Sequence, residues 1–202
     1  MSEIGTDAML TTERLVLRPF TRNDNAAFRE LAGDLAVARM TSDIPHPLSV
    51  AQADHWLSPV AGEHRFALWC EGSLVGGAGT FKRECGTGEL GFWLGRAYWG
   101  RGFATEGARA VLAHAVANAS YAAFSSSHFD DNPASRRVLE KLGFEPAGAG
   151  RIWSAARASA VEAQWMWLSL AKARALYVDP TAETPPIRSR WQSFTERLVR
   201  LS

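Results

Sequence analysis

The chain has 202 residues, a length that suits one domain with or without a short tail. Hydrophobic residues make up 47% and charged residues 21%, close to the averages for globular proteins, so the composition excludes wholesale disorder. The formal net charge of +1 offers no overall attraction to nucleic acid, and we expect no nucleic-acid partner. Cys70 and Cys85 lack a CxxC pair and cannot form a four-thiolate zinc site, so no metal is expected.

Neither a secretory signal nor a membrane span is expected. Residues 1–7 are acidic and lack the basic-then-apolar order of a signal peptide. The longest weakly polar stretch, Ala108 to Phe124, is interrupted by His114, Asn118 and Ser120 and falls short of the roughly 18 apolar residues that a span needs. We therefore expect a cytoplasmic protein.

The first elements predicted in chain order are one strand and two short helices. Alternating leucines predict a strand over 15–20, and an apolar stripe that extends to Leu35 predicts a helix over 23–33. Two prolines predict a loop over 40–47, after which Ser49 is the N-cap of a short helix.

The middle of the chain predicts an antiparallel meander. Strands over 65–70 and 74–81 are separated by a Glu-Gly-Ser turn that is typical of a hairpin. A third strand over 89–94 places Leu90 and Leu94 on the same face.

Helices and strands then alternate. A helix is expected after Gly102, a strand over 121–128, a helix from Asn132 to Gly143, and strands from Phe144 and over 161–170. This order predicts an α+β fold, with a mixed, mostly antiparallel twisted sheet, flanking helices and one strand–helix–strand crossover.

The domain organisation follows from a change in composition near the end. Residues 1–175 are expected to form a single domain, and residues 176–202 a proline-containing linker followed by an amphipathic helix. That helix could pack on the domain, form a homodimer interface, or bind a membrane surface or an acidic partner; the sequence leaves these open.

The segment from Leu94 to Glu106 carries the clearest chemical signal, because a strand end leads through a glycine-bearing turn into a helix. The first N–H groups of a helix have no intrahelical partner, and the helix dipole is positive there. Gly100 and Gly102 let the backbone wrap an anion and Arg101 adds a cation, which predicts a phosphate or diphosphate cradle. An ordinary helix N-terminus fits the same residues, and the Gly-Lys-Ser/Thr of a P-loop is absent.

Two motifs stand about thirty residues apart. The first is Trp99-Gly100-Arg101-Gly102-Phe103-Ala104, and the second, over 132–144, begins Asn132-Pro133-Ala134-Ser135 and ends Lys141-Leu142-Gly143-Phe144. Together they resemble the motifs of the GNAT superfamily of acyl-CoA-dependent N-acetyltransferases. The opening Glu13-Arg14-Leu15-Val16-Leu17-Arg18-Pro19 resembles the branch that includes the ribosomal-protein alanine N-acetyltransferases. The resemblance extends over roughly residues 10–170.

The resemblance implies that two parallel central strands, ending near Leu94 and His128, splay apart and hold acetyl-CoA between them. Backbone groups for the pantetheine arm and the thioester carbonyl would come from Phe92, Trp93 and Leu94. Trp99 stands where the family motif usually has Gln or Arg. The residues that would hold the diphosphate and the rest of the cofactor are Trp99, Gly100, Arg101, Gly102, Phe103, Ala104, Thr105 and Asn132.

Direct attack of an amine on the thioester requires a base, a stabilised oxyanion and an acid for the thiolate, but no covalent enzyme intermediate. Many relatives use a tyrosine as the acid, but Leu139 stands at that position here, so Ser135 is the substitute that we expect. Glu89 is the first choice for the base, with Glu84 and His128 as alternatives.

Several residues are expected near the acceptor. Arg157, in a loop with Ser154, could pair with an acceptor carboxylate, although a surface arginine is the simpler interpretation. Asp43 and His46 could line the acceptor mouth. The tryptophans at 153, 165 and 167 are expected in the core or in a channel wall.

The leading hypothesis is an enzyme that transfers the acetyl group of acetyl-CoA to a primary amine, either a protein N-terminal Ala or Ser or a small-molecule amine. A non-catalytic acyl-CoA sensor or scaffold is the alternative, favoured by the missing tyrosine. A nucleotide-binding α/β protein is a third hypothesis.

Overall fold

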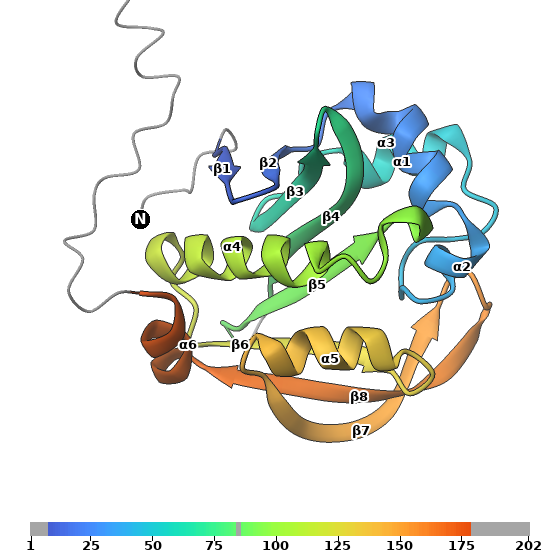
Figure 1. Ribbon diagram of the computed structural model, residues 1–202. Coiled ribbons are helices and arrows are strands. Elements are labelled where there is room, and N and C mark those ends of the chain that lie inside the picture. Colours follow the sequence, from blue (N-terminus) through green and yellow to red (C-terminus); the bar gives the residue numbers. More distant parts are fainter. Residues whose placement is uncertain (1–7, 84–85, 179–202) are drawn as a thin grey trace, which may run out of the picture.

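The computed structural model describes residues 8–83 and 86–178. Its centre is one eight-stranded sheet in the order β1-β2-β3-β4-β5-β6-β8-β7 (Figure 1). The strands are β1 (Leu10–Thr11), β2 (Val16–Pro19), β3 (Glu63–Cys70), β4 (Ser73–Lys82), β5 (Gly88–Leu94), β6 (Ala123–Phe129), β7 (Glu145–Ser154) and β8 (Ser159–Ser169). All neighbouring strands are antiparallel except β5 and β6. The predicted α+β class and the antiparallel meander are confirmed.

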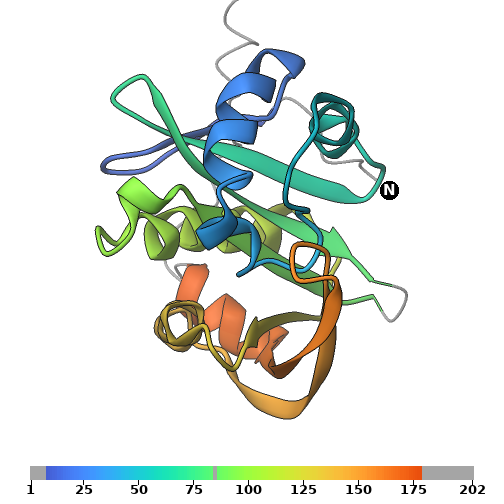
Figure 2. The ribbon, with the colours of Figure 1, turned by 90° about the vertical axis from the view of Figure 1, so that its right-hand side faces the viewer.

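Helices cover both faces of the sheet. The N-terminal elements are η1 (Arg22–Asp24), α1 (Asn25–Ala32), α2 (Leu35–Ala38) and α3 (Val50–Leu57); the later ones are η2 (Arg96–Tyr98), α4 (Phe103–Asn118), α5 (Pro133–Lys141) and α6 (Leu170–Tyr177). Seen from the side, α4 and α5 lie on one face and α3 on the other (Figure 2).

The alternation of strand residues builds two apolar cores, one on each face. Leu90 and Leu94 of β5 join the larger core with Phe103 of α4 and Leu139 of α5. Trp93, between them in sequence, points the other way and packs in the smaller core of the N-terminal helices. Strand β5 is therefore anchored on both sides.

The local sequence signals explain most element boundaries. The Ser49 side chain accepts a hydrogen bond from the Gln52 N–H at the start of α3, and the Asn132 side chain accepts one from the Ser135 N–H at the start of α5. Gly143 ends α5 with a φ of +89°, a conformation that favours glycine.

Two helical predictions need correction. The stripe that appeared to extend to Leu35 is broken, because Asp34 accepts a hydrogen bond from the Ala36 N–H and starts the separate helix α2. Helix α6 was not expected. The Ser169 side chain caps it, and the Tyr177 hydroxyl donates a 2.6 Å hydrogen bond to the Leu142 carbonyl.

The domain boundary expected after residue 175 falls inside α6. The amphipathic helix expected near the end of the chain lies outside the described residues. Within the described ranges, no helix has the length and apolarity needed to cross a membrane.

Candidate active site

The two parallel strands β5 and β6 pair over only two positions. Gly88 lies opposite Phe124, and Glu89 lies opposite Ser125. Beyond Glu89 no ladder joins the two strands, and their C-terminal ends diverge (Figure 1). The splay that the resemblance implied is present, and it leaves part of the β5 edge without a neighbouring strand.

The direction of the β5 backbone shows which groups face this opening. The Ser126 hydroxyl donates a 2.8 Å hydrogen bond to the Leu90 carbonyl, so this carbonyl points toward β6. In the antiparallel pair with β4, successive residues point alternately toward and away from the partner strand. The N–H and C=O groups of Phe92 and Leu94 therefore point into the opening, whereas those of Trp93 face β4.

Trp99 forms a hydrogen bond with one of these backbone groups. Its indole Nε1 donates a 2.8 Å hydrogen bond to the Leu94 carbonyl. Phe92 is thus the residue of β5 whose N–H and C=O both face the opening without a partner in the described part of the chain. Sequence reasoning offered Phe92, Trp93 and Leu94 alike, and it did not foresee the role of the Trp99 side chain.

The glycine turn at the start of α4 has the conformation of an anion cradle. Gly100 and Gly102 have φ angles of +74° and +82°, which strain any residue with a Cβ. Gly102 is the N-cap of α4 and has no side chain to satisfy the first-turn amides over 103–105. The Arg101 guanidinium lies 4.8 Å from the centre of the Phe103 ring. These amides and the helix dipole favour a bound anion.

Arg14 and Glu106 hold this turn in place. Glu106 accepts hydrogen bonds from the Thr12 hydroxyl at 2.6 Å and from the Arg14 backbone N–H and Nε at 2.9 and 2.8 Å. Arg14 Nη1 also donates to the Arg101 carbonyl at 2.9 Å, and its guanidinium lies 4.7 Å from the Phe103 ring centre. We call these residues the Arg14 clamp. Arg14 belongs to the Glu13–Pro19 motif, but the sequence alone does not indicate these contacts.

Helix α5 brings Asn132 and Ser135 to its N-terminal turn. The Asn132 side-chain oxygen accepts a 3.1 Å hydrogen bond from the Ser135 N–H. The Ser135 hydroxyl is half-buried and has no hydrogen-bonding partner within the described residues. Leu139 is completely buried in the larger core, so this position supplies packing and no polar group.

Glu89 lies in a cavity on the face of the sheet opposite α4 and α5. The cavity has a volume of 270 Å³. Its lining residues are Ser42, Arg83, Glu89, Ser125, Ser126, Ser127, Ile152 and Trp165. Glu89 forms an ion pair with Arg83, and the Glu89 hydrogen bond, opposed by desolvation, raises the pKa of the Arg83 guanidinium. We call this the acceptor-side cavity.

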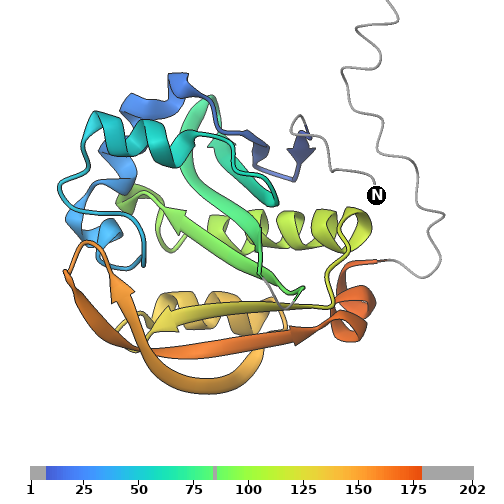
Figure 3. The same cartoon turned by 180° about the vertical axis from the view of Figure 1, so that it is seen from behind.

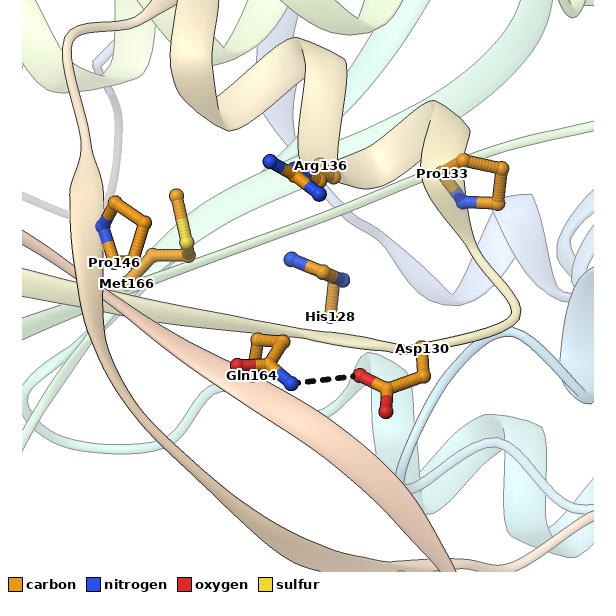
Figure 4. Close-up of a pocket in the computed structure, with 7 residues that line it drawn as sticks. All are labelled: His128, Asp130, Pro133, Arg136, Pro146, Gln164 and Met166. Carbon is orange, nitrogen blue, oxygen red and sulfur yellow. Dashed lines mark hydrogen bonds between the residues drawn. The ribbon is translucent and has the colours of Figure 1, made fainter.

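His128 faces a different cavity, beneath α5. It shares that 380 Å³ space with Pro133, Arg136 and Met166, and its ring points toward the helix (Figure 4). Because successive strand residues point to opposite faces, His128 of β6 faces away from Ser125 and Ser127 of the acceptor-side cavity. The structure therefore separates His128 from Glu89. Glu84, the other alternative base, lies outside the described residues.

The loop between α2 and α3 lies beside the β7–β8 turn and closes one end of the acceptor side (Figure 3). The Ala155 N–H donates a 2.8 Å hydrogen bond to the Ser42 carbonyl, and the buried Ser154 hydroxyl donates to the Thr41 carbonyl. Asp43 accepts a hydrogen bond from the Trp56 indole. These contacts fix the loop against the sheet.

Arg157 is neither a free surface arginine nor available to an acceptor carboxylate. It forms a bidentate ion pair with Asp131, at 2.9 and 3.0 Å, and its Nε donates a 2.8 Å hydrogen bond to the Arg39 carbonyl. The Arg157 hydrogen bonds, opposed by desolvation, hold the pKa of Asp131 below its usual value. His46 is also engaged, because its Nδ1 lies 2.8 Å from the Gly33 carbonyl oxygen.

The three late tryptophans are more exposed than a core position allows. Trp165 and Trp167 are each 42% exposed, and Trp153 is 60% exposed. The expectation of core packing is wrong for all three, because each leaves a large part of its surface open to solvent. Trp165 does line the acceptor-side cavity, as a channel-wall residue would.

Comparison with known proteins identifies the family. The model of the acetyltransferase (GNAT) domain matches residues 14–145. The N-acetyltransferase p20 of Bacillus licheniformis is 24% identical over 162 residues, which cover 76% of this chain and 91% of that protein. The chain belongs to the GNAT acetyltransferase family and is an acetyl-CoA-dependent acyltransferase.

Solved structures share the fold. A GNAT-family acetyltransferase from Bacillus anthracis superposes with a TM-score of 0.71 and 21% identity, covering 81% of this chain and 99% of that one. The RimL ribosomal alpha-N-protein acetyltransferase in complex with coenzyme A superposes with a TM-score of 0.70 and 15% identity, covering 82% and 99%. Both likenesses show that the fold is shared.

The Arg14 clamp predicts a specific pH dependence of stability. Desolvation raises the pKa of Glu106, but hydrogen bonds from Thr12 and Arg14 and the Arg14 charge outweigh it, so the net pKa is lowered. Such a carboxylate stabilises the folded state above its unfolded pKa of about 4.3, and this contribution is lost as the pH falls through the folded pKa. We expect Glu106→Gln to lower the free energy of unfolding by about 1.5 kcal/mol at pH 7.

Urea denaturation at several pH values measures this effect, and the difference from the wild type should shrink below about pH 4. Glu162→Gln is the matched control, because the Glu162–Arg151 pair is exposed on both sides and should contribute little. A difference for Glu106→Gln that stays constant down to acid pH would show that its carboxylate charge is not the stabilising feature.

Proposed function

We propose that this protein transfers the acetyl group of acetyl-CoA to a primary amine by direct attack within a ternary complex. The observation that carries the proposal is the unpaired backbone of Phe92 at the splay. The glycine turn of α4 follows the C-terminal end of the same strand, and Glu89, near its N-terminal end, lines the cavity on the face of the sheet opposite α4. A donor and an acceptor can therefore approach the same opening from opposite faces of the sheet.

Cofactor binding rests on backbone groups. The amides from Gly100 to Thr105 receive the diphosphate, with the helix dipole and Arg101 adding positive potential. The pantetheine arm pairs with the free N–H and C=O of Phe92, as an added strand would. The Asn132 amide reaches the cofactor from α5. A backbone N–H in the opening stabilises the oxyanion of the tetrahedral intermediate.

Starting from an ammonium group, the reaction removes two protons from the nitrogen and supplies one to the departing thiolate. The Glu89 carboxylate accepts a proton from the acceptor ammonium, directly or through water, because an amine with a pKa of about 8 to 10 is mostly protonated at pH 7. The neutral amine nitrogen then bonds to the thioester carbon, and the carbon–sulfur bond breaks as the nitrogen loses its second proton, which passes to the departing thiolate. The Ser135 hydroxyl donates a hydrogen bond to the departing thiolate, a fair leaving group with a pKa of about 8.5.

Two kinds of acceptor present a suitable amine: a protein N-terminal Ala or Ser, and a small-molecule amine. Isothermal titration calorimetry with acetyl-CoA, combined with release of free thiol in the presence of an amine panel, tests the proposal. Binding with turnover supports the enzyme. Binding without turnover of any amine supports the alternative sensor or scaffold, and no heat at millimolar coenzyme A contradicts both.

Gly102→Glu should abolish detectable acetyl-CoA binding, because it adds a Cβ and a negative charge at the N-cap of α4, where the diphosphate is expected. Calorimetry measures the change. Gly72→Glu is the matched control: Gly72 also has a positive φ, of +77°, but it lies in the β3–β4 turn. Equal affinities in the two variants would contradict the placement of the diphosphate.

Glu89→Gln should lower kcat by about 10²- to 10⁴-fold and leave the affinity for acetyl-CoA unchanged, because it removes the base without touching the cofactor site. The defect should shrink as the assay pH approaches the pKa of the amine, since a neutral amine needs no base. Steady-state kinetics over pH 6–10 test both points. A pH-independent loss, or an equal loss in Glu162→Gln, would argue that Glu89 is not the base.

Ser135→Ala should lower kcat by at least about tenfold with little change in the dissociation constant for coenzyme A, if the hydroxyl serves the departing thiolate. Ser135→Thr, which keeps a hydroxyl, is the comparison that should recover part of the activity. Parallel losses in turnover and in cofactor affinity would instead make Ser135 a binding residue.

A further inference from the structure

The acceptor side of the sheet carries an exposed aromatic surface that the transfer chemistry does not require. Trp165 and Trp167 are two residues apart on β8 and so point to the same face. Their neighbours on β6 are Ser127 and Ser125, and Ser125 in turn lies opposite Glu89. Both tryptophans therefore stand on the face of the sheet that holds the proposed base.

Glycines on β7 leave room for the Trp165 indole to lie against the strand. Gly148 and Gly150 lie beside Trp165 and Ala163 in the β7–β8 pair. A Cβ at Gly150 would lie 2.2 Å from Cη2 of Trp165, so only glycine leaves room for the ring there. The indole lies against the bare backbone of β7 and still exposes 42% of the residue. A large aromatic surface held in place and left open is typical of a binding site.

The position of Trp165 relative to Glu89 fits a small ligand. Two strand spacings of about 4.8 Å and one two-residue step of about 6.6 Å separate them, which gives about 12 Å between their Cα atoms. Both side chains line the same 270 Å³ cavity, with the Ser127 hydroxyl between them. An amine at Glu89 and a ring on Trp165 can thus belong to one molecule with a short connecting chain.

The charges of the cavity favour a single ammonium group. Its lining includes one carboxylate, Glu89, and one guanidinium, Arg83, which are paired. A polyamine favours several separated carboxylates, and among the described residues of this lining Glu89 is the single one. The remaining surface is made of serine hydroxyls, Ile152 and the Trp165 ring.

Resting on the proposed function, we propose that the acceptor is a primary amine joined by a short alkyl chain to an aromatic ring, and that Trp165 is the specificity-determining residue that stacks on this ring. The ammonium group faces Glu89, and the ring lies on the exposed indole. Aromatic stacking adds to apolar burial, so the ring contributes to binding beyond its size.

Thiol release with a matched set of amines tests this assignment. The probes are 2-phenylethylamine, its saturated analogue 2-cyclohexylethylamine, n-butylamine, spermidine and short peptides with N-terminal Ala or Ser. We expect kcat/KM for 2-phenylethylamine to exceed that for n-butylamine and spermidine by at least about tenfold, with the saturated analogue between them.

Trp165→Ala should raise KM for 2-phenylethylamine about tenfold with a smaller change in kcat, and Trp165→Phe should recover most of the loss. Trp153→Ala is the matched control, because Trp153 is also an exposed tryptophan but lies on the opposite face of β7. Its kinetics should match those of the wild type. Circular dichroism and light scattering confirm that each variant keeps its fold and mass.

The outcomes distinguish a failure of the aromatic-acceptor proposal from a failure of the proposed acetyltransferase function. Preferred turnover of peptides or spermidine, or an unchanged KM in Trp165→Ala, overturns the aromatic acceptor and leaves the acetyltransferase proposal standing. A smaller oligomeric mass of Trp165→Ala without a change of KM would also overturn the aromatic acceptor, because the Trp165 indole of the wild type would then be covered by a second copy of the chain. Absence of turnover with every amine contradicts the proposed function itself.

Discussion

The site depends on the incomplete pairing of β5 and β6. A parallel strand pair normally satisfies the backbone groups along its whole length, and an unpaired backbone group that is buried costs free energy. Here the ladder between the two strands ends at Glu89, and the next carbonyl, that of Leu90, accepts a hydrogen bond from the Ser126 hydroxyl instead. Beyond it the sheet is held open, and the polar backbone groups of Phe92 become available to a ligand.

Two side-chain networks keep the opening in its shape. On the cofactor side, the Arg14 clamp joins the N-terminal segment to the first turn of α4 and to the carbonyl of Arg101. On the acceptor side, Arg157 joins the β7–β8 turn to Asp131 and to the Arg39 carbonyl. Each network is built from an arginine that binds groups far away in sequence. Preorganised polar groups of this kind avoid rearrangement during the reaction.

The fold was largely predictable because its signals are local. Alternation of apolar residues marked the meander, Ser49 and Asn132 marked helix starts, and the glycine turn before α4 was identified from a few adjacent residues. Helix α6 was missed although its signals are local: Ser169 is an N-cap residue, and Leu170–Tyr177 is rich in alanine, leucine, lysine and arginine, which favour helix. The break before α2 depends on one hydrogen bond to the Asp34 side chain.

The sequence predicted the site only where its residues belong to one continuous segment. The glycine turn and the edge of β5 are continuous stretches, whereas the partners of Arg14, Arg157 and Trp165 are distant in the chain. The sequence made Glu89 the first choice for the base and left His128 as an alternative, and only the alternation of β6 against its neighbours places the two in different cavities. The exposure of Trp165 depends on glycines across the strand pair, which no pattern within β8 reveals.

The hydrogen bond from Trp99 to the Leu94 carbonyl has a consequence for how deeply a cofactor arm can enter. With that carbonyl occupied, the pairing edge of β5 shrinks to essentially one residue, so an amide-bearing chain laid along it has a single alignment rather than several. In the proposed binding mode, the Trp99 hydrogen bond therefore restricts where the cofactor arm can pair, and the backbone of Phe92 sets the position of the thioester.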